Sequence, residues 1–418
     1  MNLTYNETQP AQEAWLFPGG GCQYVGMGKA LYDNFAMARE AFEEAEDLLK
    51  LHLAKTCFEG PLDTLSSMEY AQPAIFVVSL ASYRVYTQEL GKVPGILAGH
   101  SLGEYTALCA AGVFSLTDAL QLVGIRGELL KAAGIDADGT MMAVNKLPVA
   151  QVEAMVKVRQ AAGDQIYMAV YNAPFQVVVS GQRQHLENLG SLLEAEGGHI
   201  NMLPINTPSH CPLMQTAADH MRNALEDYTP SVMKVPVVAN LTGEPYQGVE
   251  SVIDTLTTHM IAPVRWEQSM RYMQAQGYQT YTDVGPRQVL EKMTEHILTG
   301  ATAYSLDNNV DVDMLYATAG KTRPNLYALM RAFEVMAIST PDFGDDTEGY
   351  AERVGVPFER LQAKARAATP ESTDDHMVMD AYQTLTEVWD GKAVPTANRT
   401  ALMDHYLVKT GTQGRFGF

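Results

Sequence analysis

The stretch GILAGHSLGEYTALCAA, residues 95–111, sets Ser101 in a Gly-x-Ser-x-Gly motif. The apolar run 95–99 predicts a buried strand, and the residues after Ser101 predict a helix. A Gly-x-Ser-x-Gly at such a junction is typical of a nucleophile elbow, whose glycines permit a tight turn that exposes the serine hydroxyl at the end of a parallel sheet. The alternative is an ordinary turn or N-cap serine, and the pentapeptide alone favours neither.

Strand, turn and helix patterns alternate on both sides of this motif. Upstream, the apolar run 14–17 leads into a glycine-rich loop and a helical pattern over 28–50. A second helix is expected over 72–89, with Pro73 in its first turn. Downstream the alternation continues to about residue 285 and includes a strand candidate at 235–240. The pattern predicts an α/β fold built on a parallel sheet.

One internal segment follows a different order. Over residues 141–205 the patterns read strand, helix, strand, strand, helix and strand, which predicts a ferredoxin-like unit. We therefore expect an α/β core formed by residues 1–135 and 206–310, with an inserted ferredoxin-like subdomain at 136–205. The remaining residues, 311–418, predict a mainly helical C-terminal extension, to which the sequence assigns no role.

Composition and charge exclude several classes of protein. The chain has 418 residues and a formal net charge of −20, which works against nonspecific binding of nucleic acid or anionic membrane. An anionic ligand must therefore meet a local basic pocket. No apolar run is long enough to span a bilayer, and the N-terminus lacks the pattern of a secretory signal. Four cysteines without paired spacing predict neither a metal site nor a disulfide framework, so we expect a soluble, cytoplasmic protein.

Two further residues are candidates for a site around Ser101. A serine hydroxyl needs a base, and among the ten histidines His210 is best placed, because it ends a strand candidate and precedes a helix that starts at Pro212. Arg126 falls on the apolar face of a helix whose start carries a capping pattern at Ser115. An inward guanidinium needs an anion, which is either an internal carboxylate or a carboxylate on the substrate.

The glycine-rich loop FPGGGCQYVGMGK, residues 17–29, matches neither a dinucleotide-binding motif nor a P-loop. Its glycines can expose backbone N–H groups beside the elbow, which would form an oxyanion hole with the amide of Leu102. A simple close-packed turn is the equal alternative.

Together these motifs resemble the malonyl-CoA:acyl-carrier-protein transacylases and the related acyltransferase domains of polyketide synthases. The resemblance covers roughly residues 14–310. The shared pieces are FPGGGCQYVGMG (17–28), AQPAIF (71–76), GHSLGEYTAL (99–108), RG (126–127), YNAP (171–174), PSHC (208–211), PVRW (263–266) and DVGPRQVL (283–290). The resemblance implies a hydrolase-like α/β core with a ferredoxin-like insertion.

The resemblance also implies roles for individual residues. Ser101 would be the nucleophile, and His210 the base that later returns the proton. Arg126 would hold the free carboxylate of the malonyl group, with Gln72 in the same pocket. The other implied roles are oxyanion-hole amides at Gly20 and Leu102, an extender-selecting position at Ser209, and a backbone carbonyl at His259 that orients the histidine in place of an acidic third member.

The implied reaction is a ping-pong transfer that needs no bound cofactor. A malonyl group passes from CoA to Ser101, and from the serine ester to the phosphopantetheine thiol of an acyl carrier protein, in fatty-acid or polyketide synthesis. We expect a freestanding enzyme that acts in trans, with an excised synthase domain as the alternative. Ser209 within TPSH favours malonyl, while methylmalonyl or an unusual extender stays open.

The chain departs from the family motifs at four positions. Gly20 and Cys22 stand where glutamine and serine are usual, His259 where glutamine is common, and Arg287 where glycine is frequent. None of these changes removes a reacting group. Two other functions compete with transfer: an acyl hydrolase that clears carrier proteins, and a non-catalytic scaffold that docks them. Arg126 argues against the hydrolase, because uncharged acyl chains gain nothing from a buried cation.

Overall fold

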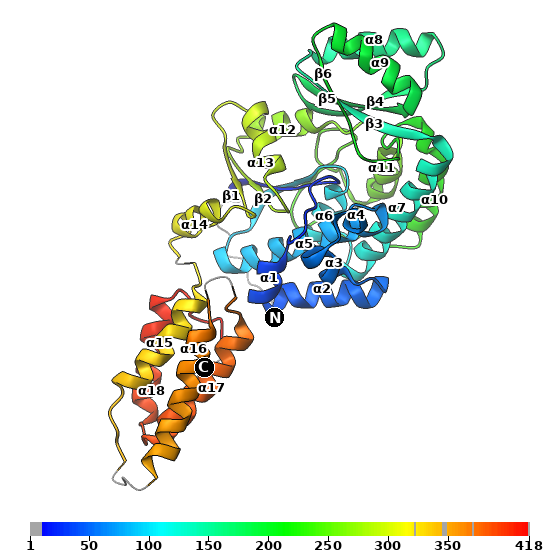
Figure 1. Ribbon diagram of the computed structural model, residues 1–418. Coiled ribbons are helices and arrows are strands. Elements are labelled where there is room, and N and C mark those ends of the chain that lie inside the picture. Colours follow the sequence, from blue (N-terminus) through cyan, green and yellow to red (C-terminus); the bar gives the residue numbers. More distant parts are fainter. Residues whose placement is uncertain (1–10, 322, 345–348, 370–371, 417–418) are drawn as a thin grey trace. The chain divides into compact units, whose positions relative to one another are not determined.

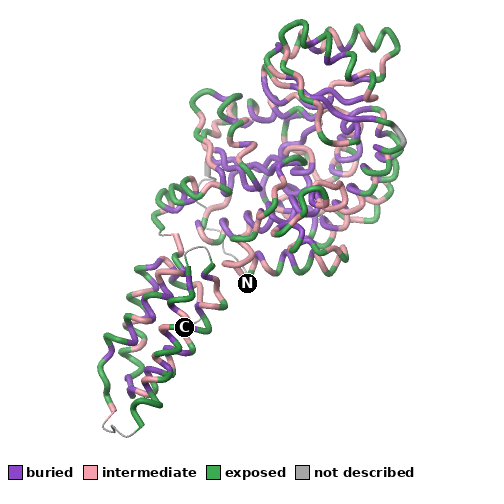
Figure 2. Tube along the Cα trace, in the orientation of Figure 1, coloured by how far each residue is buried: buried purple, intermediate pink, exposed green. Residues whose placement is uncertain are grey.

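The computed structural model describes residues 11–321, 323–344, 349–369 and 372–416. Contacts divide the chain into two compact units (Figure 1). The first unit ends at Val312 and leaves out Ala30–Arg39, and the second joins Ala30–Arg39 to the residues from Asp313 onward. Buried residues gather in the interior of each unit (Figure 2).

A five-stranded parallel sheet forms the centre of the first unit. Its strand order is β7-β2-β1-β8-β9. The strands are β1 Ala11–Phe17, β2 Pro94–Gly99, β7 Val237–Val238, β8 Thr280–Asp283 and β9 Thr302–Ser305. Phe17 pairs with Gly99, and Leu16 pairs with Asp283, so the carboxyl ends of the three central strands meet at one edge. Sites of α/β proteins form at this edge.

Helices surround this sheet. α6 packs on β1 and β2, and α5 packs against α7. Before the insertion the chain forms α1 Lys29–Asn34 and α2 Ala36–Leu49, of which residues 30–39 belong to the second unit, and then α3 Leu53–Glu59, α4 Leu62–Leu65, α5 Met68–Leu90, α6 Gly103–Ala110 and α7 Leu116–Ala137. Those after it are α10 Gln215–Glu226, α11 Val252–His259, α12 Trp266–Ala275, α13 Val289–Ile297 and α14 Asn309–Thr318, with short 3-10 turns at Pro212–Met214 and Val249–Ser251.

The insertion forms a four-stranded antiparallel sheet in the order β4-β5-β3-β6. Its elements are β3 Gly139–Asn145, α8 Val149–Ala161, β4 Ile166–Ala173, β5 Gln176–Gln182, α9 Arg183–Ala195 and β6 His199–Met202. This chain order and strand order are those of a ferredoxin-like unit. Both helices cover one face of the sheet (Figure 1). The opposite face shares an apolar cluster with the parallel sheet, in which Met141 and Ala169 join Leu16 and Ala98.

The second unit is helical. Its elements are α15 Leu326–Ser339, a π-helical turn Ala351–Gly355, α16 Val356–Ala367, α17 Asp375–Gly391 and α18 Thr396–Lys409. The unit has an apolar cluster of its own, with Phe333 and Trp389 at 0% exposed area. Arg415 and Phe35 join its two parts, because the guanidinium lies 4.1 Å from the centre of the Phe35 ring.

The predicted fold class is confirmed: an α/β parallel-sheet core, an inserted ferredoxin-like subdomain and a helical C-terminal region. The boundaries drawn for these domains stay predictions. Three local expectations were wrong. The helix expected from 72 begins at Met68, so Pro73 lies inside it; the helix over 28–50 is interrupted at Phe35; and the strand at 235–240 shrinks to Val237–Val238.

Candidate active site

The turn at Ser101, which the sequence predicts to be a nucleophile elbow, joins β2 to α6 at the carboxyl edge of the parallel sheet. Ser101 has a φ of 52°, a strained left-handed conformation for a residue with a side chain. The flanking glycines are required by close approach. A Cβ on Gly103 would lie 2.0 Å from the carbonyl oxygen of Phe17, and a Cβ on Gly99 would lie 1.9 Å from the carbonyl carbon of Gly103.

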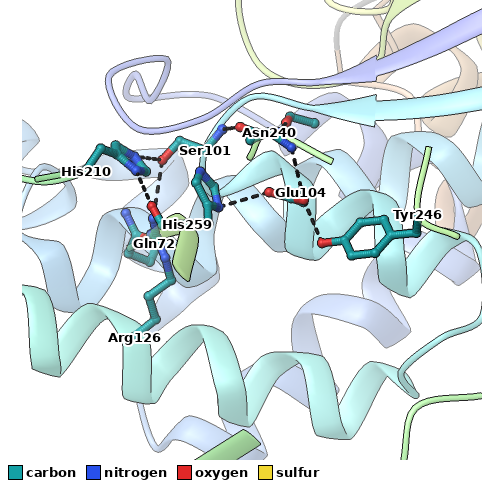
Figure 3. Close-up of polar contacts among 9 residues, drawn as sticks. Gln72, Ser101, Glu104, Arg126, His210, Asn240, Tyr246 and His259 are labelled. Atoms are coloured by element: carbon teal, nitrogen blue, oxygen red, sulfur yellow. Dashed lines mark hydrogen bonds and ion pairs between the residues drawn. The ribbon is translucent and has the colours of Figure 1, made fainter. Parts of the chain in front are cut away.

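His210 meets Ser101 from the segment that follows the insertion (Figure 3). Its Nε2 lies 2.8 Å from Ser101 Oγ, and its Nδ1 lies 2.9 Å from the backbone carbonyl oxygen of His259. Because Nδ1–H donates to that carbonyl, the lone pair of Nε2 faces the serine hydroxyl. Burial, followed by the electrostatic effects of His259 and Arg126, holds the pKa of His210 well below its usual value. The imidazole is therefore neutral at pH 7 and able to accept a proton.

Arg126 reaches the same space from α7. The residue is 2% exposed, its Nη1 donates to Gln72 Oε1, and its Nη2 donates to Ser101 Oγ at 3.3 Å. Within the described residues Arg126 joins no ion pair, and its Nε has no hydrogen-bond partner. Burial lowers the pKa of the guanidinium, and the Tyr105 ring lies 5.6 Å from its Cζ. Among the described residues, this buried cation beside the serine therefore has no carboxylate at ion-pair distance, although the charge of Glu104 raises the pKa of the guanidinium.

The glycine-rich loop, residues 17–29, lies beside Gln72, the partner of Arg126. An ideal Cβ on Gly20 would lie 3.9 Å from Gln72 Nε2, so Gly20 is next to the Gln72 side chain. Leu102 follows the serine at the N-cap of α6 and is fully buried. In the part of the chain that the structure describes, the backbone N–H groups of Gly20 and Leu102 donate no hydrogen bond. Such free amides can receive an oxyanion.

Ser209 is tied to the inserted subdomain through its backbone. Its carbonyl oxygen accepts a hydrogen bond from Ser180 Oγ of β5 at 2.6 Å. No hydrogen bond of the Ser209 hydroxyl is recorded among the described residues. The residue therefore helps to set the position of His210, which has a φ of 62°.

Sequence reasoning missed several buried polar residues behind the elbow. Asn240 Oδ1 accepts a hydrogen bond from the backbone N–H of Ser101 at 2.7 Å. Glu104 is fully buried and accepts from the Tyr246 hydroxyl at 2.6 Å. His100 points to Asn172, whose Oδ1 lies 2.9 Å from its Nε2. The one available signal was Glu104 itself, a charge within an apolar helical run.

Among the residues with described positions, no helix combines the length and the apolar composition that a membrane span requires. Groups of three or more metal-ligating His, Cys, Asp or Glu side chains are likewise absent from the described ranges.

Comparison with known proteins identifies the family. The family model described as an acyl transferase domain matches residues 14–339. A malonyl CoA-acyl carrier protein transacylase of Bacillus subtilis is 34% identical over 353 residues, which are 84% of this chain and 88% of that protein. The polyketide biosynthesis malonyl CoA-acyl carrier protein transacylase BaeC of Bacillus velezensis is 35% identical over 287 residues, 68% of this chain and 96% of that one.

Solved structures agree with these matches. FabD from Acinetobacter baumannii superposes with a TM-score of 0.70 at 33% identity, covering 74% of this chain and 98% of that one. The malonyl-transacylase in PlMCAT:AntF, described as a complex with a type II polyketide synthase acyl-carrier protein, gives a TM-score of 0.70 at 32% identity, with 73% and 99% covered. By sequence and by structure, this chain belongs to the acyl transferase domain family.

Proposed function

We propose that this chain transfers a malonyl group from coenzyme A, through an ester on Ser101, to the phosphopantetheine thiol of an acyl carrier protein. The observation that carries the proposal is Arg126: a buried cation 3.3 Å from the serine hydroxyl with no ion-pair partner in the described residues. A substrate with a free carboxylate would supply that partner in the bidentate geometry that arginine favours. The names of the relatives from Bacillus subtilis and Bacillus velezensis support this substrate and acceptor.

The first half-reaction acylates the serine. His210 Nε2 takes the hydroxyl proton as Ser101 Oγ attacks the thioester carbon. The amides of Gly20 and Leu102 donate to the oxygen that becomes negative in the tetrahedral intermediate. The C–S bond then breaks, and the protonated His210 returns its proton to the CoA thiolate. The carbonyl of His259 stabilises the imidazolium through Nδ1–H in the interval.

The second half-reaction repeats these steps with a different nucleophile. His210 takes the proton of the phosphopantetheine thiol, the thiolate attacks the malonyl ester, and the proton passes to Ser101 as the ester bond breaks. Arg126 holds the malonyl carboxylate throughout and thereby selects the acyl group, because an acyl group without a carboxylate leaves the buried cation unpaired. Ser209, directly before the histidine, acts in the choice of extender.

The proposal also covers the domains and the cellular compartment. We assign catalysis to residues 1–135 and 206–310, with 136–205 as a subdomain and 311–418 as an extension. We also place the reaction in the cytoplasm, which is supported by four buried cysteines that are all free thiols.

Intact-protein mass spectrometry tests the function. The chain is mixed with malonyl-CoA, methylmalonyl-CoA or acetyl-CoA, and a phosphopantetheinylated carrier protein is then added. A malonyl adduct that is absent in Ser101→Ala and moves to the carrier protein is the expected result. An adduct that passes to water while the carrier protein stays unmodified would make the enzyme a hydrolase. Failure of the serine to acylate with any donor would favour a docking scaffold.

A further inference from the structure

Glu104 is a fully buried carboxylate three residues after Ser101, in the first turn of α6. Burying a carboxylate is costly unless its oxygens have partners. Here Oε1 accepts from the Tyr246 hydroxyl at 2.6 Å and from the backbone N–H of Asn240 at 3.2 Å. Oε2 accepts no hydrogen bond among the described residues, but it lies at an ion-pair distance of 2.9 Å from Nδ1 of the His259 ring. Three residues from two segments far from Glu104 in the sequence, 240–246 and the end of α11, therefore converge on one carboxylate (Figure 3).

The first connection runs to the nucleophile. The backbone of Asn240 donates to Glu104, while its side chain holds the elbow from both sides. Asn240 Oδ1 accepts from the Ser101 N–H at 2.7 Å, and Nδ2 donates to the Gly99 carbonyl at 2.5 Å. Glu104 thus holds Asn240, and Asn240 holds the strained backbone of Ser101.

The second connection runs to the base. The ring of His259 contacts Glu104, and the carbonyl of the same residue accepts from His210 Nδ1 at 2.9 Å. The two imidazole rings are also stacked, with centroids 4.7 Å apart and planes at 23°. Holding the His259 side chain therefore holds both the ring and the carbonyl that orient His210.

We infer that Glu104 is a positioning residue for the dyad, acting on His210 through the His259 side chain and on Ser101 through Asn240. The inference rests on the proposed function, and it deepens it. An acid that touched His210 directly would be a third catalytic member; Glu104 lies one residue further out and touches no reacting atom. His259 thereby acts through its side chain as well as through its backbone carbonyl.

Single substitutions test this inference by the rate of Ser101 acylation from malonyl-CoA. In Glu104→Gln an amide nitrogen replaces one carboxylate oxygen, so one of the three partners Asn240, Tyr246 and His259 loses its acceptor. We expect the maximal rate of acylation to fall about tenfold or more, since small displacements of reacting groups cost up to 10²-fold. The KM should change less than the rate, because Glu104→Gln removes the charge of Glu104 near Arg126 but none of the hydrogen bonds of Arg126 to Gln72 and Ser101. His259→Leu, which keeps the carbonyl but cannot pair with Glu104, should lose a similar factor. His259→Gln, whose amide can donate to Glu104, should retain most of the rate.

A double variant tests whether the two residues act together. If Glu104 acts on His210 through His259, the acylation rate of the double variant Glu104→Gln/His259→Leu should be little lower than that of the less active single variant. Glu13→Gln is the matched control, because Glu13 is also a buried glutamate, with Trp15 Nε1 and Thr282 Oγ1 as donors, in the same unit but outside the site. It should leave the acylation rate unchanged.

Labelling by a serine-directed organophosphorus fluoride gives a second readout that needs no malonyl group. Slower labelling of Glu104→Gln than of Glu13→Gln is expected. Equal labelling and acylation rates in these two variants, or fully multiplicative losses in the double variant, would overturn the inference. If Glu104→Gln does not fold, equal rates for His259→Gln and His259→Leu overturn it instead. If the unsubstituted chain labels but does not acylate, the proposed function fails and the labelling rates still decide the role of Glu104.

Discussion

At the scale of single residues, Arg126 and His210 share one buried space but differ in charge. Arg126 keeps a charge without a carboxylate partner among the described residues, whereas His210 is held neutral. A fixed cation beside a neutral base suits a substrate that brings one negative charge and a reaction that begins with proton removal. Each half of this arrangement leads to its own prediction.

Arg126→Ala should change acyl selectivity. Removing the guanidinium takes the hydrogen bond to Ser101 from both reactions, but it removes a carboxylate partner only from the malonyl group. The ratio of kcat/KM for malonyl-CoA over acetyl-CoA should therefore fall more than about tenfold, equivalent to 1.4 kcal/mol. Competition between the two thioesters, read by the mass of the serine adduct, measures the ratio. Arg222→Ala, at an exposed surface ion pair, is the control. An unchanged ratio would assign Arg126 to structure alone.

The acid limb of the reaction should lie well below pH 6.5. A histidine with its ordinary pKa is half protonated at that pH, but burial, with the effects of His259 and Arg126, lowers the pKa of His210. Only neutral His210 accepts the serine proton, so kcat/KM for malonyl-CoA should stay nearly constant from pH 7.5 to 6.5 and fall at lower pH. Labelling by the organophosphorus fluoride over the same range excludes effects on the substrate. A midpoint at or above pH 6.5 contradicts the expectation.

The residues that the sequence identified are those with a local signature. Ser101 has its glycine frame, Arg126 its apolar helix face, and His210 its place before a proline. Asn240 has no such signature, and the charge of Glu104 in an apolar helical run does not reveal its partners, because Asn240 lies 139 positions from Ser101 and 136 positions from Glu104. Only the folded chain brings these polar groups together.

At the scale of elements, the elbow is the tightest junction in the site. Gly103→Ala would place a methyl group 2.0 Å from the Phe17 carbonyl oxygen and 3.0 Å from that of Pro18, so α6 must move away from β1. We expect acylation of Ser101 to fall about 10²-fold, the order of loss that misplaced reacting groups cause. Gly355→Ala is the control, because its Cβ would meet nothing within 4 Å. A fully active Gly103→Ala would show that the elbow tolerates this shift.

Element boundaries failed where local chemistry and packing disagree. Pro73 suggested a helix start, yet α5 begins at Met68 with Ser67 as N-cap, and the buried Pro73 gives up one backbone hydrogen bond inside the helix. The strand at 235–240 is shortened beside Pro236, which has no N–H to donate. β9, Thr302–Ser305, was not expected at all, because only its last residue is buried and no apolar run marks it.

At the scale of the whole molecule, alternation of strands and helices predicted the class of fold but not the order of the parallel strands. The central strand β1 pairs with β2 and β8, which come from opposite sides of the insertion. Such pairing is decided by long-range packing, as in the apolar cluster that joins Leu16 of the sheet to Met141 of the subdomain. The ferredoxin-like unit was easier to predict, because its elements follow one another in the sequence.

The second unit offers the last prediction. Every residue assigned to the proposed site lies in the first unit, and the apolar cluster of the helical unit is drawn from residues between Leu326 and Leu407. A chain that ends at Gly320, after α14, should therefore still acylate Ser101 from malonyl-CoA, at a rate within about threefold of the full chain. Stopped-flow release of CoA thiol measures this rate.

The truncation also removes contacts of Ala30–Arg39. Arg39 lies 3.8 Å from Asp375, and the Phe35 ring packs under Arg415. Losing these partners exposes Phe35, so the shortened chain should melt at a lower temperature, and Phe35→Ser in the same chain should reduce aggregation without changing the acylation rate. If the shortened chain melts cooperatively yet leaves Ser101 unacylated, the helical unit must take part in catalysis, although none of its residues belongs to the proposed dyad or oxyanion hole.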